Sequence, residues 1–117
     1  MEARPSLART WFEWRRMRAP VDRYHHGDRS APTYDLECEL DHIVSSVYSL
    51  GSACMAGNEW DYVAQGTRRL ARLDELASTL EGLTGNDERR AELDVYVQAT
   101  RKVLQAIIEA DICTTAD

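Results

Sequence analysis

LECELDHIVSSVYSLGSAC, residues 36–54, is the most regular stretch of this 117-residue chain. Its apolar side chains recur at alternating spacings of four and three, at Leu36, Leu40, Ile43, Val47, Leu50 and Cys54. This heptad spacing is typical of a long helix that packs against other helices. Val44, Tyr48 and Met55 widen the apolar stripe beyond the seam of an isolated coiled coil, which favours a helix inside a globular bundle.

The residues around this stretch predict where the helix begins and ends. Thr33 is placed to cap the N-terminus, and the acidic residues of the first turns, Asp35, Glu37 and Glu39, complement the helix dipole. Gly57 is placed to end the helix.

A second helix is expected to begin at GNEWD, residues 57–61, with Asn58 as its cap and Asp61 in a variant of the capping box. It should end near EGLTGN, residues 81–86. Its inward face is predicted to contain Val63, Gly66 or Thr67, Leu70, Leu73, Ala77 and Leu80. Because glycine costs a helix about 1 kcal/mol relative to alanine, Gly66 indicates the close approach of a neighbouring helix.

A third helix is expected after TGND, residues 84–87, capped by Asn86 or Asp87 and ending around Asp111. Its predicted inward stripe contains Leu93, Tyr96, Val97, Thr100, Val103, Leu104, Ile107 and Ile108. No proline lies between residues 33 and 117, and no segment there alternates with a period of two. The body of the chain is therefore predicted to be all-α.

The short links between the three helices predict an antiparallel three-helix bundle. The stripe of residues 36–50 is wider than two neighbouring helices are expected to cover, so we expect a homodimer to bury the excess. The predicted dimer or core seam consists of Leu36, Leu40, Ile43, Val44, Val47 and Leu50.

Residues 1–32 form a different region, an N-terminal basic aromatic arm and linker ahead of the helical body of residues 33–117. The arm carries seven arginines and four acidic residues, a net charge of +3. The body carries seven basic and sixteen acidic residues, a net charge of −9. The linker is VDRYHHGDRS, residues 21–30, which is polar and lacks helical periodicity.

The arm contains WFEWRRMR, residues 11–18, within a predicted short amphipathic helix that ends before Pro20. A helix of this length has little stability alone in water, so its aromatic face must dock on a surface. Three surfaces are open: the chain's own bundle or a second subunit, a partner protein, or lipid headgroups. The predicted partner-binding residues are Leu7, Trp11, Phe12, Trp14, Arg15, Arg16, Met17 and Arg18.

No pattern in the chain predicts a catalytic, metal or cofactor site. Cys38 and His42 lie four residues apart, but a structural zinc site needs four ligands, so they are interpreted as ordinary residues. Cys54 is assigned to packing, and the three widely spaced cysteines are expected to be reduced. An enzyme or ligand-binding bundle would need an inward polar cluster, where the stripes offer only Thr67 and Thr100.

Charge and hydropathy limit the partners and the compartment. The acidic body argues against direct nucleic-acid binding, which depends on contacts between cations and phosphates. No apolar run approaches the ~20 residues of a membrane span, and the N-terminus lacks a secretory signal. A cytoplasmic protein that acts on another protein is the expectation.

In size, helical make-up and N-terminal arm, the chain resembles the small bacterial quorum-sensing anti-activators of the QslA type. The matched stretches are ELDHIVSSVYSLGSACM, residues 39–55, and RRLARLDELASTLEGL, residues 68–83. The resemblance implies a dimer that binds a LuxR-type transcription factor and masks its dimerisation surface. The alternative is a secretion chaperone or immunity protein whose acidic surface neutralises a basic effector.

Overall fold

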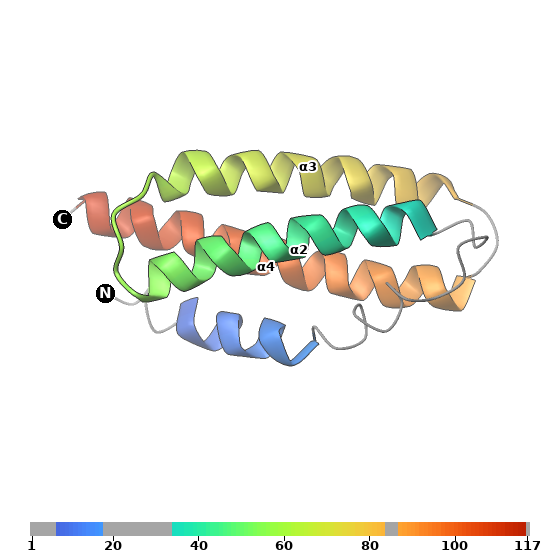
Figure 1. Cartoon of the computed structure of the whole chain (residues 1–117), viewed down its shortest axis with the longest axis horizontal. Helices are drawn as coiled ribbons and strands as arrows, with labels where there is room; N and C mark the ends of the chain where they lie inside the picture. The colour runs from blue at the N-terminus through green and yellow to red at the C-terminus, as the bar shows by residue number, and fades with distance from the viewer. Residues whose placement is uncertain (1–6, 18–33, 84–86, 117) are drawn as a thin grey trace.

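The computed structural model describes residues 7–17, 34–83 and 87–116, and for residues 87 and 111–116 it describes the backbone alone. Within these ranges the chain forms four helices and no strand, which confirms the predicted all-helical class. They are the N-terminal helix (residues 7–17), α2 (Tyr34–Met55), α3 (Tyr62–Gly82) and α4 (Asp87–Ala116). Figure 1 shows the three long helices side by side, with the N-terminal helix along α2 and α4.

Gly57 ends α2 as predicted. Its φ of 79° lies in the left-handed region that glycine adopts without steric cost. The Gly57 amide donates to the Cys54 carbonyl at 3.1 Å, and the Asn58 amide donates to the Ala53 carbonyl at 3.0 Å. These two bonds form a Schellman motif, which satisfies carbonyls that the end of the helix would otherwise leave unpaired.

The start of α3 differs from the prediction, because Asp61 and not Asn58 is the N-cap. The Asp61 carboxylate accepts a hydrogen bond from the Ala64 amide at 3.1 Å. Asn58 instead completes the turn that ends α2, and its carbonyl accepts a hydrogen bond from the Tyr62 hydroxyl at 2.5 Å. The first residues of the short link therefore end α2, and α3 begins only after Asp61.

The far end of α4 also differs, since this helix continues to Ala116 and not merely to Asp111. Neither glycine nor proline follows Asp111, so no residue there forces the backbone out of the helix. The predicted caps Thr33 and Asn86, and the predicted linker at residues 21–30, lie outside the described residues.

The inward faces largely follow the predicted stripes, but α3 is rotated slightly from its predicted face. Tyr62 and Leu76 are buried although they were not expected to be, while Thr67 is exposed. Gly66 is buried, and a Cβ there would lie 2.7 Å from Cγ1 of Ile108. The predicted close approach of another helix at Gly66 is confirmed, and the helix is α4.

The apolar stripe of α2 is covered within a single chain. All the residues of the predicted seam are buried: Leu36, Leu40, Ile43, Val44, Val47 and Leu50. Leu7, Trp11 and Trp14 of the N-terminal helix belong to the same hydrophobic core. The seam that was expected to require a second subunit is thus covered within one chain, in part by the N-terminal helix, while Met55 at the end of the stripe is exposed. Dimerisation stays a prediction.

Candidate protein-binding surface

The N-terminal helix docks through its two indoles. Trp11 is 4% exposed and Trp14 is 1% exposed. The Trp11 ring lies 5.7 Å from the ring of Tyr48 on α2, and the Trp14 ring lies 6.4 Å from the ring of Tyr96 on α4. Aromatic pairs at such distances add to the stabilisation from burial alone. The helix is therefore part of the core and is held by both α2 and α4.

Two consecutive hydrogen bonds hold the indole of Trp14, the less exposed of the two tryptophans, in place. The Nε1 group of Trp14 donates to the Thr100 hydroxyl at 2.8 Å, and that hydroxyl donates to the Tyr96 carbonyl at 2.8 Å. Both polar side-chain groups of this buried contact are satisfied, which removes the cost of burying them. The inward position of Thr100 was predicted, but its role as acceptor for an indole 86 residues earlier has no local signal in the sequence.

Gly51 provides the space for the other indole. A Cβ at this position would overlap Cζ3 of Trp11. Glycine in the middle of a helix lowers the stability of the helix by up to ~1 kcal/mol relative to alanine. The close packing of the Trp11 ring on Gly51 offsets this loss.

We expect Gly51→Ala to lower the free energy of unfolding by about 1–3 kcal/mol, because the Trp11 ring must leave its seat to make room for the methyl group. Urea denaturation followed by circular dichroism measures the change. Gly82→Ala is the matched control, since nothing lies within 4 Å of a Cβ there. An equal loss of stability in the two variants would show that the Trp11 ring does not pack on Gly51.

The opposite side of the N-terminal helix faces solvent, and we call Arg9, Phe12, Glu13 and Arg16 its outward face. All four side chains are exposed, and Phe12 is 57% exposed. Arg9 and Glu13 form an ion pair at 3.6 Å that is too exposed to add much stability. The outward face thus presents an aromatic ring among charged groups.

The predicted partner-binding residues are divided between the two sides of this helix. Leu7, Trp11 and Trp14 are buried in the core, and Met17 is partly buried against it. Arg15 is exposed, with its guanidinium 4.7 Å above the ring of Tyr48, a cation–π contact that helps to hold the helix. Phe12 and Arg16 point outward, and Arg18 lies outside the described residues.

A second aromatic site lies at the link between α2 and α3. Trp60 is 44% exposed, and the guanidinium of Arg69 lies 5.8 Å from the centre of its ring. Arg69 also donates to the carbonyls of Ser46 and Gln65. Burial, and the nearby charge of Arg68, lower the pKa of Arg69. Because Arg69 makes these contacts within the chain, we interpret the pair of Trp60 and Arg69 as part of the packing of α2 on α3.

Sequence reasoning missed a buried ion pair between the starts of α2 and α4. Glu37 is 1% exposed, and its carboxylate accepts from Nε of Arg89 at 2.5 Å and from Nη2 at 3.0 Å. Glu37 was interpreted only as a charge that complements the helix dipole. A bidentate pair of this kind fixes the relative position of the two helices.

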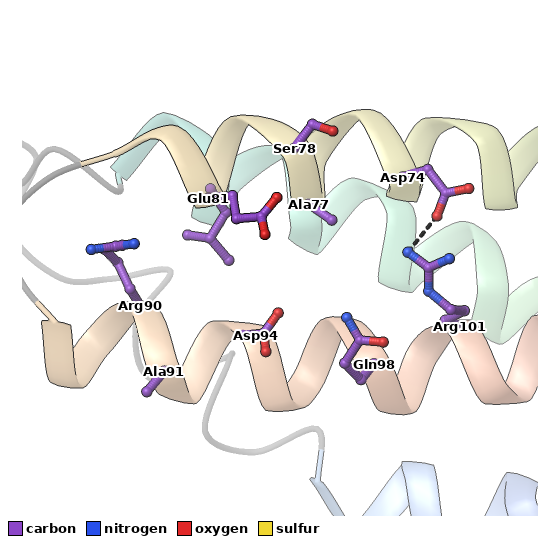
Figure 2. Close-up of a pocket in the computed structure, with 10 residues that line it drawn as sticks. Asp74, Ala77, Ser78, Glu81, Arg90, Ala91, Asp94, Gln98 and Arg101 are labelled. Atoms are coloured by element: carbon purple, nitrogen blue, oxygen red, sulfur yellow. Dashed lines mark ion pairs between the residues drawn. The ribbon is translucent and has the colours of Figure 1, made fainter.

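A polar groove of about 640 Å³ opens between α3 and α4. Figure 2 shows carboxylates from both helices in this space, Glu81 from α3 and Asp94 from α4. Arg90 lies toward one end, and the ion pair between Asp74 and Arg101, at 2.5 Å, lies toward the other. Three of the sixteen acidic residues of the body thus line one recess together with two arginines, which composition alone did not predict.

The residues that were weighed as metal ligands, Cys38 and His42, lie about one turn apart on α2. Cys38 is partly exposed and His42 is exposed. In the described part of the chain, no three histidine, cysteine or acidic residues are placed to hold a metal ion. No helix among the described residues is both long and apolar enough to span a membrane.

The candidate functional site is therefore the outward face of the N-terminal helix. No family model, curated protein or solved structure matches this chain. Among the described residues, the large apolar side chains with the most exposure are Phe12, Met55, Trp60 and Val95. Of these, Phe12 is the one that lies on the docked N-terminal helix, beside exposed arginines.

Proposed function

We propose that this chain is a small regulatory protein that binds another protein stoichiometrically through the outward face of its N-terminal helix. In this proposal the body is an antiparallel three-helix bundle, which is supported by the order of colours along α2, α3 and α4 in Figure 1. Leu7, Trp11 and Trp14 hold the helix on the bundle, and Phe12 and Arg16 contact the partner.

The observation that carries the proposal is the exposure of Phe12, 57%, on a helix whose opposite side is locked by two buried indoles. A short helix without such anchors would have to be ordered when the partner binds, at a cost in affinity. Here the ring and the neighbouring arginines are already in place. Aromatic residues and arginine are enriched in interfaces, and arginine is prominent among hot spots.

The proposed partner is a LuxR-type transcription factor in the cytoplasm, and the proposed action is to mask the surface by which that factor dimerises. This part comes from the resemblance to the quorum-sensing anti-activators in size and helical make-up. It is supported by the acidic body, which would repel DNA and leave the partner as the only component that contacts it.

Substitutions on the surface test the proposal better than truncation does, because removing the first twenty residues would also remove Trp11 and Trp14 from the core. The tagged full-length chain and the double variant Phe12→Ala with Arg16→Ala are used to capture proteins from the native cytoplasm. Trp60→Ala is the matched control, an exposed aromatic residue outside the N-terminal helix.

We expect the double variant to recover the captured partner at least about tenfold less well, as for loss of a hot spot worth 1–2 kcal/mol, and Trp60→Ala to recover it fully. The purified partner should then lose DNA binding when one equivalent of the full-length chain is added. Equal recovery by both variants would overturn the proposed surface. A partner whose DNA binding is unchanged would overturn the anti-activator role.

A further inference from the structure

The lining of the groove between α3 and α4 carries one more acidic than basic side chain, with Asp74, Glu81 and Asp94 against Arg90 and Arg101. Its walls carry Glu81 and Asp94, which extend into the same space from opposite helices (Figure 2). Asp74 at one end is already paired with Arg101. The small side chains of Ala77 and Ala91 line the groove beside these carboxylates and leave room for an incoming side chain.

The chain itself carries the complementary surface. The outward face of the N-terminal helix presents Arg9 and Arg16 on either side of the Phe12 ring along the helix. With Glu13, which pairs with Arg9, the outward face has two basic side chains and one acidic one, a net charge of +1. The groove, with three acidic and two basic side chains, has a net charge of −1, so the two surfaces have opposite net charge. Complementary charge of this kind favours association and fixes its register.

We propose that the groove between α3 and α4 receives the outward face of the N-terminal helix of a second copy of this chain. In the pair, the guanidinium groups of Arg9 and Arg16 from one copy face the carboxylates of Glu81 and Asp94 of the other. Phe12 lies between these ion pairs, over the alanines of the groove.

The position of α4 allows two such contacts in one symmetric pair. One side of α4 supplies Asp94 to the groove, and its inward side supplies Tyr96 and Thr100 to the seat of the N-terminal helix. The groove and the N-terminal helix therefore flank the same helix. Val95, which is 57% exposed on α4, would be covered near the two-fold axis. A two-fold pair in which each copy gives its helix and receives the other's is closed, so it forms a dimer and not a fibre.

This pairing would be weak and sensitive to salt, because exposed ion pairs are screened and each contributes little. It rests on the proposed function in one respect: it occupies the outward face that is proposed to bind the partner. Self-association would then compete with partner binding. Dilution, or binding of the partner, would dissociate the dimer into the active monomer.

Sedimentation velocity of the purified full-length chain tests the pairing without any partner. We expect a dimer whose dissociation constant rises at least about tenfold between low and high salt. The groove variant, Glu81→Arg with Asp94→Arg, and the helix variant, Arg9→Glu with Arg16→Glu, should each be monomeric. Circular dichroism checks that both remain folded, as expected for substitutions at the surface.

An equimolar mixture of the groove and helix variants should form a dimer again, because each acidic surface now meets a basic one. A charge-matched control, Glu59→Arg with Glu75→Arg, changes the net charge as much as the groove variant does and should still dimerise. A monomeric wild-type chain at low salt, a dimer unaffected by either variant, or no dimer in the mixture would overturn the inference. The capture experiment with Phe12→Ala and Arg16→Ala reports separately on the proposed function.

Discussion

Trp14→Ala should lower the free energy of unfolding by about 3–5 kcal/mol, the range found for large aromatic residues removed from protein cores. Trp14 is among the largest fully buried side chains of the described residues. Its loss leaves a cavity between the N-terminal helix and α4 and removes the donor to the Thr100 hydroxyl. Urea denaturation followed by circular dichroism gives the value.

Phe12→Ala is the control for Trp14→Ala on the same helix. Its side chain is exposed, so the expected change is within about 0.5 kcal/mol. Trp14→Phe keeps most of the ring but removes the Nε1 donor, and it should fall between the two. If Trp14→Ala costs no more than Phe12→Ala, the N-terminal helix is not part of the core.

Arg89→Ala should also destabilise the protein by about 3–5 kcal/mol, because it removes one partner of a buried ion pair. The carboxylate of Glu37, 1% exposed, would lose both of its hydrogen bonds from the guanidinium. Arg101→Ala is the control, since its ion pair with Asp74 is more exposed and should contribute at most about 1 kcal/mol.

The double variant Glu37→Met with Arg89→Met separates the two contributions to this loss. If the cost of Arg89→Ala comes from the uncompensated charge, replacing both partners with apolar side chains should recover most of the stability. Chemical denaturation of the single and double variants completes the cycle. A double variant as unstable as Arg89→Ala would show that the arginine acts through its packing and not through its charge.

The helical class and most of the core could be predicted because they depend on local periodicity. Heptad spacing placed the buried face of α2, and Gly57 and Gly66 indicated the end of one helix and the close approach of another. The start of α3 was misjudged because Asn58 and Asp61 are both good caps, and the choice depends on the turn that closes α2.

The seat of the N-terminal helix could not be predicted to the same degree. The spacing of Leu7, Trp11 and Trp14 indicates a docking face but does not specify the surface on which it docks. That surface is formed by residues far away in sequence, among them Gly51 and Thr100, and the relation exists only after α2 and α4 are assembled. The wide stripe of α2, which was the reason to expect a dimer, is covered within the chain, in part by this fourth helix, and the dimer itself stays a prediction.

No pattern in the sequence predicted two features, the ion pair of Glu37 with Arg89 and the groove between α3 and α4. Their members are separated by 52 residues in the first case and lie on two helices in the second. Charged side chains at such positions are usually solvated, and only their placement in space shows which ones face each other.

We conclude that the N-terminal helix is a docked part of the core that presents Phe12 to solvent. The decisive measurement is hydrogen exchange of the Trp14 indole N–H, followed by NMR on the free protein. We expect exchange as slow as that of the core amides of α4, because the N–H is buried against Thr100. Exchange at the rate of an exposed indole would contradict the docked helix and the surface built on it.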